Sequence, residues 1–215
     1  MTLALRLTVP IFFAYFSIGV VYGVIFTHSG FAWYLAPLIS AIVFAGSVQF
    51  VALSMMSEHA TVFAVIIATV FIAFRNAFYG LSFLDRYKTG WLAKSVLVFT
   101  LVDATYAILT ANPPKQGLND IKFCLSVSLL NFVYWVAGTF LGAVMSCWIP
   151  EFDALKFVLP AFFMTVVVGF FLKSRQWHAI VAPILCMVIA YFIWPAQYFL
   201  LAILFSIITI FFLKR

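Results

Sequence analysis

The chain has 215 residues, of which 67% are hydrophobic and only 8% are charged, and its formal net charge is +6. A soluble domain carries roughly 25% charged residues, so this composition excludes a soluble globular protein and indicates an integral membrane protein. The positive charge would suit nucleic-acid binding in a soluble protein. In a membrane protein it is better explained by loop lysines and arginines that set topology and meet anionic lipid, so no nucleic-acid partner is expected.

Long apolar runs separated by short polar clusters predict an all-α, polytopic helix bundle in the lipid bilayer, with residues 1–215 forming a single transmembrane domain. A membrane-spanning helix needs roughly 20 residues. The apolar runs are, in chain order, Val9–Phe26, Trp33–Met56, Thr61–Leu84, Leu92–Ala111, Phe123–Trp148, Leu155–Leu172, Ala179–Trp194 and Tyr198–Leu213. The last two are short and are split by Trp194-Pro195, so we expect seven or eight hydrophobic segments.

The distribution of Lys and Arg gives an expectation for the orientation. With eight alternating spans, most of these residues fall on the side of the N-terminus, which favours cytoplasmic termini. The opposite side would hold four, namely Arg86, Lys88, Lys94 and Lys156, three of them around one loop. A re-entrant Trp33–Met56 segment would reverse everything downstream, so both topologies stay open.

A spacing of Y-x3-G-x3-G occurs twice, at Tyr15, Gly19 and Gly23 and again at Tyr134, Gly138 and Gly142. Each copy is followed by a proline and, nine residues later, a glycine, at Pro37 and Gly46 and at Pro160 and Gly169. Duplicated halves with a substrate between them are common in transporters. A chance match in a chain rich in aromatic residues and glycine is the alternative explanation for this internal repeat.

Two opposite charges, Arg75 and Asp103, lie inside consecutive apolar runs. A charge at the centre of a membrane helix costs at least about 2.5 kcal/mol. At the rise of an α-helix, Arg75 lies about 15 Å from the loop between the two runs and Asp103 about 16 Å from it. The two side chains are therefore expected at the same depth, where they can pair. Either the pair is structural, or it marks a substrate or proton site.

Other polar side chains lie near these charges or in similar stripes. Tyr79 is four residues after Arg75 on the same helical face, and Asn76 belongs to a neighbouring small and polar face. Asn131 lies in a stripe of small and polar residues of the fifth run. Such stripes are typical of helix contacts in lipid, so packing and binding are both open for Asn131.

The second run contains a serine at every seventh position, at Ser40, Ser47 and Ser54, which predicts a packing seam. Gln49 lies beside Gly46 and Ser47, and a mid-membrane amide needs hydrogen-bond partners. Broken helices in transporters expose backbone dipoles that bind zwitterions. Gln49 is therefore either a substrate ligand or a structural hydrogen-bonding group.

Motifs of catalysis are missing from the sequence. There is no nucleophile–base pair, no metal-ligand spacing, no Walker loop and no GxSxG. The three cysteines show no CxxC spacing. We therefore expect no enzyme activity, no catalytic residue, no metal and no cofactor.

Several motifs together resemble the AzlC family, the large subunit of two-component branched-chain amino-acid exporters. They are AGSVQF at Ala45–Phe50, FRNAFYGLS at Phe74–Ser82, VDATYA at Val102–Ala107, GTFLGA at Gly138–Ala143 and FVLPAFFM at Phe157–Met164. The resemblance extends from about Tyr15 to Arg175. The family commonly has Arg-His where this chain has Arg75-Asn76, and Asp-Glu where it has Asp103-Ala104, so one imidazole and one carboxylate are missing.

The resemblance implies a multi-pass transport protein of the bacterial inner membrane that exports branched-chain amino acids with the proton gradient. It also implies a partner, a small multi-spanning subunit of the AzlD type. The residues expected to bind substrate are Gln49, Ser47, Arg75, Asn76, Tyr79 and Asn131. Asp103 is the expected proton-coupling residue. The alternative is a membrane scaffold or assembly subunit without a substrate, in which the charge pair is structural.

Overall fold

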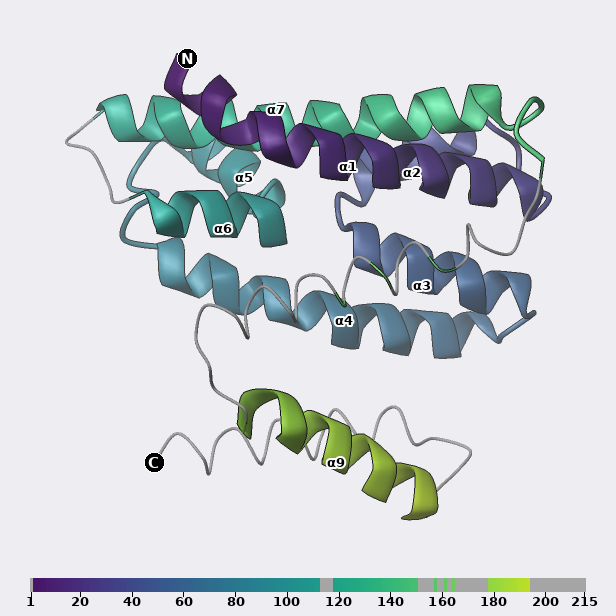
Figure 1. The fold of residues 1–215 in the computed structure, drawn as a ribbon. Coiled ribbons are helices and arrows are strands. Elements are labelled where there is room, and N and C mark those ends of the chain that lie inside the picture. Colours follow the sequence, from purple (N-terminus) through teal and green to yellow (C-terminus); the bar gives the residue numbers. More distant parts are fainter. Residues whose placement is uncertain are drawn as a thin grey trace. The chain divides into compact units, whose positions relative to one another are not determined.

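The computed structural model describes residues 2–112, 118–150, 157, 161, 164 and 178–193, and the chain divides into two compact units, Met1–Leu159 and Pro160–Arg215. The regular elements in the described residues are helices, and no strand occurs among them, which confirms the all-α prediction. In the first unit they are α1 (Thr2–His28), α2 (Leu35–Ile42), α3 (Gly46–Ser57), α4 (Val62–Phe83), α5 (Trp91–Phe99), α6 (Asp103–Ala111) and α7 (Leu118–Met145) (Figure 1). In the second unit α9 spans His178–Ile193.

Three described helices, α1, α4 and α7, are long and apolar enough to cross a membrane. They correspond to the first, third and fifth predicted runs. The run Ala179–Trp194 corresponds to α9, which begins one residue earlier, at His178, and ends at Ile193. The runs Leu155–Leu172 and Tyr198–Leu213 lie largely or wholly outside the described residues.

The predicted run Leu92–Ala111 is not one straight helix. It forms α5 and α6, which are bent by 112° at the break between Phe99 and Asp103. The end of α5 lies at the middle of α7, where Phe99 packs near Phe132. The end of α6 lies back at the starting side, where the Leu109 carbonyl accepts a hydrogen bond from Arg86, which precedes α5. The pair therefore enters the bundle and returns to the same side.

The predicted run Trp33–Met56 is broken in the same way, into α2 and α3. Trp33, before α2, packs near Phe140 toward the end of α7, whereas Phe44, after α2, packs against Phe132 at its middle. The chain then turns back through α3, which a short loop joins to the start of α4. This re-entrant alternative is the one that the structure adopts, and the two broken pairs enter the bundle from opposite ends (Figure 1).

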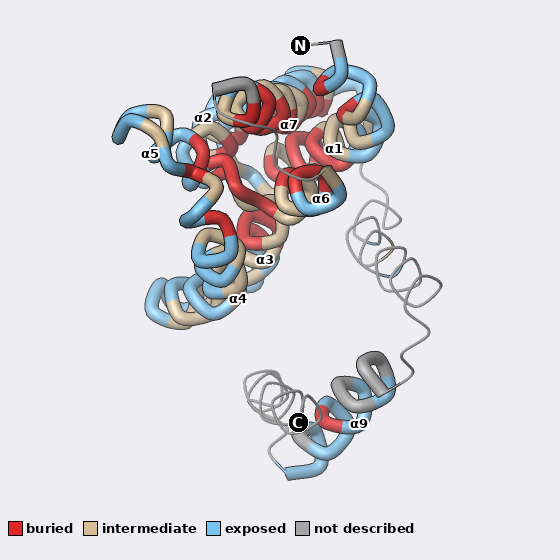
Figure 2. Tube along the Cα trace, turned by 90° about the vertical axis from the view of Figure 1, so that its left-hand side faces the viewer, coloured by how far each residue is buried: buried red, intermediate tan, exposed pale blue. Residues whose placement is uncertain are grey.

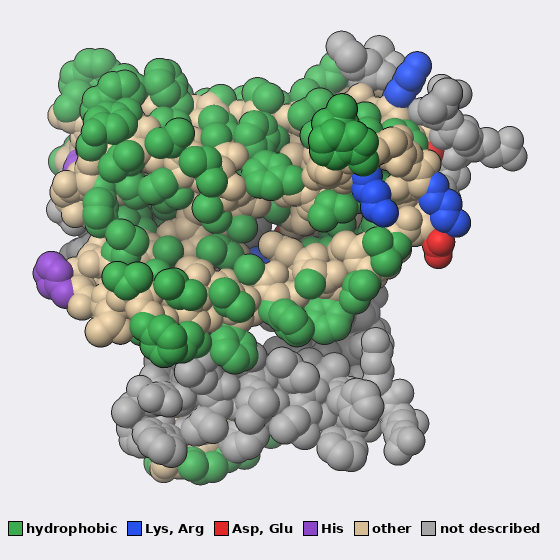
Figure 3. Space-filling model, turned by 180° about the vertical axis from the view of Figure 1, so that it is seen from behind, with side chains coloured by type: hydrophobic (Ala, Val, Ile, Leu, Met, Phe, Trp, Pro, Cys, Tyr) green, Lys and Arg blue, Asp and Glu red, His purple; other side chains and the backbone are tan. Residues whose placement is uncertain are grey.

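The re-entrant topology changes the charge distribution between the two ends of the bundle. Five of the described Lys and Arg residues lie at the end where α1 begins, namely Arg6, Arg86, Lys88, Lys94 and Lys122. The opposite end carries His28, Glu58 and His59, and Figure 3 shows basic and histidine side chains gathered at opposite ends. The predicted conflict around the Arg86–Lys94 loop therefore disappears in the described part of the chain. The positive-inside rule therefore favours the cytoplasmic side for the end of the bundle that carries these five residues.

Labelling of single cysteines tests this topology. In a variant without the native cysteines, a cysteine at Lys88 should react with an impermeant maleimide only in inside-out membrane vesicles, because the positive-inside rule predicts a cytoplasmic location for this loop. A cysteine at Glu58, at the opposite end and also exposed, should react only in right-side-out vesicles. Because α4 separates these two positions in either topology, a third cysteine at Ala32, which is exposed between α1 and α2, tests the re-entrant α2–α3 pair. Labelling of Ala32 and Glu58 from opposite sides would contradict the pair.

The two copies of the glycine motif pack against each other where α1 and α7 run parallel and side by side (Figures 1 and 2). A Cβ at Gly19 would lie 2.9 Å from the Trp135 carbonyl oxygen, and one at Gly138 would lie 2.5 Å from that of Phe16. Only glycine allows two backbones to approach so closely, which is how helices associate in lipid. The Y-x3-G-x3-G part of the repeat therefore has a packing role in both copies, whereas Pro160 and Gly169 lie outside the described residues.

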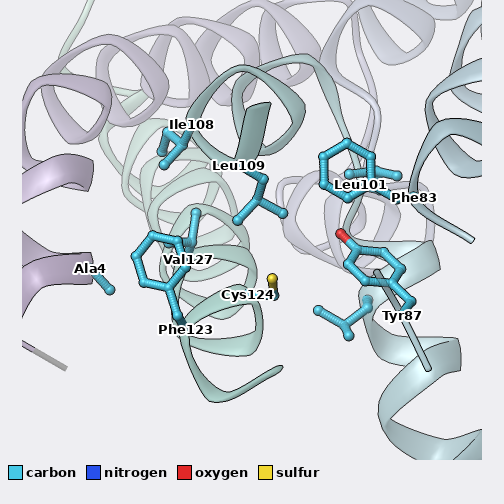
Figure 4. Close-up of a cluster of buried hydrophobic side chains, with 10 residues drawn as sticks. Ala4, Phe83, Tyr87, Leu101, Ile108, Leu109, Phe123, Cys124 and Val127 are labelled. Atoms are coloured by element: carbon cyan, nitrogen blue, oxygen red, sulfur yellow. The ribbon is translucent and has the colours of Figure 1, made fainter. Parts of the chain in front are cut away.

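A cluster of buried side chains holds the charged end of this unit together (Figure 4). It joins α1, the end of α4, both halves of the α5–α6 pair and the start of α7, and consists of Ala4, Phe83, Tyr87, Leu97, Leu101, Ile108, Leu109, Phe123, Cys124 and Val127. Most of α4 is exposed by comparison (Figure 2). The cluster fixes the α5–α6 pair against the spanning helices, and thereby places the break at the middle of the bundle.

Candidate functional site

The predicted pair of Arg75 and Asp103 is present at the middle of the bundle. The Arg75 Nη2 atom lies 2.8 Å from the Asp103 Oδ2 atom, and it also donates a hydrogen bond of 2.6 Å to the Ser47 hydroxyl. The side chains of Arg75 and Asp103 keep 38% and 37% of their surface exposed. The expectation that the two charges meet is confirmed, and the pair remains accessible to a ligand.

The local fold explains why each group points to this place. Asp103 is the first residue of α6, with Val102 before it as the N-cap, and a carboxylate is favourable at the positive end of a helix. Ser47 lies in the first turn of α3, which has Ala45 as its N-cap. Neither N-cap residue provides a side-chain hydrogen bond to its helix. The starts of two half-helices therefore meet at one guanidinium, because Asp103 of α6 and Ser47 of α3 both contact Arg75. Helix N-termini and guanidinium groups bind anionic groups.

Two tyrosines border the ion pair. Tyr79 of α4 stacks on Tyr106 of α6 with ring centroids 4.4 Å apart and lies within electrostatic range of Asp103 and Arg75. Tyr15 of α1 interacts with the same two charges and with the backbone of Ala104. Tyr79 was predicted at the site and Tyr15 was not, although Tyr15 opens the first copy of the glycine motif.

Gln49 lies near the ion pair but is fully engaged by the protein. Its Oε1 atom accepts hydrogen bonds from the Ser40 hydroxyl at 3.2 Å and from the Trp135 indole at 3.1 Å, and its Nε2 atom donates to the Val43 carbonyl. The Ser40 hydroxyl also contacts the Thr139 hydroxyl at 3.1 Å. Gln49 therefore stabilises the break between α2 and α3, which supports its structural explanation.

The predicted serine seam is wrong, because the break separates its members. Ser40 lies on α2 and contacts Gln49 and Thr139, whereas Ser47 lies on α3 and contacts Arg75. A missing Cβ at Gly46 permits this break, since a Cβ there would lie 2.7 Å from the Trp135 ring. A continuous helix with a seven-residue repeat would have kept the three serines on one face.

The two predicted asparagines lie on different helices, Asn76 on α4 and Asn131 on α7. The Asn131 Nδ2 atom donates a hydrogen bond of 3.2 Å to the Thr105 hydroxyl, so its amide faces α6. Its Oδ1 atom is buried without a hydrogen-bond partner, and so is the Oδ1 atom of Asn76. The site thus contains polar groups whose hydrogen-bonding capacity the described protein does not fill.

A second ion pair, between Arg86 and Asp120, was not predicted. Two hydrogen bonds of 2.8 Å join the guanidinium to the carboxylate, and the side chains are only 11% and 6% exposed. Hydrogen bonding to Asp120 raises the pKa of Arg86 above its ordinary value, so the pair stays charged. Since Arg86 also donates to the Leu109 carbonyl at 2.6 Å, it ties the end of α4 to both α6 and α7.

The described residues contain no group of three or more His, Cys, Asp or Glu side chains that could hold a metal ion. The polar groups of the site are a guanidinium, a carboxylate, amides and hydroxyls. These groups can bind a charged polar molecule and exchange a proton.

Comparison with known proteins identifies the family. The AzlC protein family model matches residues 10–149, which include both broken helix pairs and every residue of the candidate site. The branched-chain amino acid transport protein AzlC of Bacillus subtilis is 32% identical over 80% of this chain and 68% of its own length. An uncharacterized membrane protein of Helicobacter pylori strain J99 is 29% identical over 90% of the chain and 86% of its own length.

The inner membrane protein YgaZ of Escherichia coli K12 is 25% identical over 79% of the chain and 72% of its own length. No solved structure matches the chain significantly. The resemblance predicted from the motifs is therefore confirmed, and this membrane protein belongs to the AzlC family.

Proposed function

We propose that the protein is a secondary-active exporter of branched-chain amino acids. The observation that supports this proposal best is the accessible Arg75–Asp103 pair at the point where two half-helix N-termini meet. Such sites in transporters bind the charged groups of amino acids. The substrate of the Bacillus relative, a branched-chain amino acid by its name, fits a site with apolar surroundings.

The ion pair provides an exchange cycle. On the cytoplasmic side, the carboxylate of the substrate pairs with Arg75 in place of the Asp103 carboxylate. On the outer side, Asp103 takes up a proton as the substrate leaves. The site returns inward with this proton, releases it to the cytoplasm, and Asp103 pairs with Arg75 again. Asp103 is the only acidic residue at this depth among the residues described, so proton coupling depends on it.

The remaining parts of the proposal rest on the family. The protein acts in the bacterial inner membrane and together with a small multi-spanning subunit of the AzlD type. Ser47, Asn76, Tyr79 and Asn131 line the substrate site with Arg75, while Gln49 positions α3 through its three hydrogen bonds.

A transport assay tests the role of Asp103. We expect that Asp103→Asn, in proteoliposomes that contain both subunits, abolishes valine and leucine efflux driven by a pH gradient, because the amide cannot take up the coupling proton. Asp85→Asn is the matched control, since its carboxylate is 96% exposed in a loop. Efflux by Asp103→Asn at the rate of the control would contradict the proposed cycle.

A scaffold without a substrate is the second candidate, because Arg75 also joins α3, α4 and α6 mechanically. The exchanged variant with Arg75→Asp and Asp103→Arg separates the two functions. A scaffold should keep its folding and its assembly with the small subunit after this exchange. A transport site should lose amino-acid binding, because the charges no longer match the groups around them.

A further inference from the structure

Four buried oxygen atoms on α4, α6 and α7 lack a hydrogen-bond donor. The Oδ1 atoms of Asn76, Asp103 and Asn131 and the Oγ atom of Ser128 are buried, and none has a hydrogen-bond partner in the described protein. Asn131 and Ser128 are completely buried residues. Buried polar atoms are almost always satisfied, so a group of orphaned ones indicates a missing donor.

These atoms approach the break from three helices. Asp103 is the first residue after the break. Asn131 faces α6 through its hydrogen bond to Thr105, and Ser128 lies one turn earlier on the same face of α7. Asn76 lies two turns before Phe83 on the same face of α4, and Phe83 packs against Tyr106 of α6. The orphaned oxygens therefore come from α6 and from the two helices, α4 and α7, that contact its first turn.

The chemistry of the region is that of a cation site. Three of its four orphaned atoms are carbonyl or carboxylate oxygens. The amide oxygens of Asn76 and Asn131 can only accept hydrogen bonds, and the Asp103 carboxyl group offers an acceptor whether it is ionised or protonated. The C-terminus of α5, the negative end of that helix, also ends at the break. If the Asn131 amide were turned by 180°, one of its two polar atoms would still lack a partner, because the Thr105 hydroxyl can bond to only one of them.

We propose that this region binds the α-ammonium group of the transported amino acid. A primary ammonium has three N–H donors, which match the oxygens of Asn76, Asp103 and Asn131, with the Ser128 hydroxyl beside them. The substrate carboxylate then lies toward Arg75 and the start of α3. This inference rests on the proposed transport function. It adds that the ammonium group of the amino acid binds at the α5–α6 break and that the carboxylate binds at Arg75.

The test compares leucine with 4-methylpentanoate, which keeps the side chain and the carboxylate but lacks the ammonium. Both dissociation constants are measured on the complex with the small subunit in nanodiscs. Hydrogen bonds to a charged group predict that Asn131→Leu weakens leucine binding by roughly tenfold to a hundredfold. The same variant should change 4-methylpentanoate binding by no more than about twofold.

Ser128→Ala provides a second, milder variant in case the leucine substitution prevents folding. Its matched control is Ser126→Ala on the same helix, because the Ser126 hydroxyl is satisfied by the Lys122 carbonyl at 2.8 Å. We expect a loss of leucine affinity in Ser128→Ala and none in Ser126→Ala. Both serine variants should bind 4-methylpentanoate like the wild-type protein.

Three results would overturn the inference. Equal losses for leucine and 4-methylpentanoate would show that Asn131 does not recognise the ammonium. A leucine affinity that falls when sodium is replaced by choline, in the wild type but not in Asn131→Leu, would assign the oxygens to a metal cation. A wild-type complex that binds no aliphatic amino acid would overturn the proposed function as well, which distinguishes the two failures.

Discussion

Gly142→Ala is expected to destabilise the protein by at least about 1–3 kcal/mol, the usual effect of overpacking. The added Cβ would overlap the carbonyl oxygen and Cα atom of Val20, both of which belong to the backbone of α1. Backbone atoms cannot move aside as a flexible side chain can, so α1 and α7 must separate. Thermal melting of the purified protein in detergent micelles measures the loss.

Gly80→Ala is the matched control for this substitution. Gly80 also lies inside a long helix, α4, but a Cβ there would meet nothing within 4 Å. Alanine at such a position should stabilise the helix by about 0.5–1 kcal/mol. If the two variants melted at the same temperature, the close contact between α1 and α7 would be contradicted.

Arg86→Leu is expected to cost about 3–5 kcal/mol, because it removes the guanidinium that neutralises the buried Asp120 carboxylate. The substitution also removes the hydrogen bond that holds the Leu109 carbonyl at the end of α6. The re-entrant α5–α6 pair should then loosen. Reversible unfolding in mixed micelles gives the free energy of unfolding, and protease sensitivity of the α4–α5 loop reports the local change.

Two further variants separate the ion pair from other effects of this substitution. Lys88→Leu removes an exposed pair with Asp85 in the same loop and should change the free energy of unfolding by no more than about 1 kcal/mol. The double variant Arg86→Leu with Asp120→Leu should recover much of the stability, because no buried charge remains. A double variant less stable than Arg86→Leu alone would contradict this account.

Much of the membrane fold could be predicted from hydropathy and helix rise. The depth of Arg75 and Asp103 follows from counting residues along two apolar runs, and the 2.8 Å contact between them bears this out. The break at residues 100–102 was invisible to the same method, whereas the break at residues 43–45 was left open as a re-entrant Trp33–Met56 segment. Apolar residues at both breaks resemble those of a continuous helix. Hydropathy reports burial in lipid and does not distinguish a crossing from a return.

The hydrogen-bond partners of the polar residues required three-dimensional information. Arg86 and Asp120 looked like ordinary loop charges, and only the return of α6 brings them to the same buried corner. Gln49 could be assigned to substrate or to structure from its position alone, and the break between α2 and α3 supplies its three partners. The sequence shows which residues are costly in a membrane, while topology decides which of them meet.

The contacts between α1 and α7 follow the symmetry rule of a homodimer. Phe16 and Trp135 each follow the tyrosine of their own motif, and the carbonyl of each contacts the first glycine of the other helix. Val20 and Thr139 make the same reciprocal exchange with Gly142 and Gly23. Such an isologous interface, in which equivalent residues of both partners make the same contact, is typical of a dimer of identical subunits. Each half of the seam between α1 and α7 therefore repeats the other, although both helices belong to one chain.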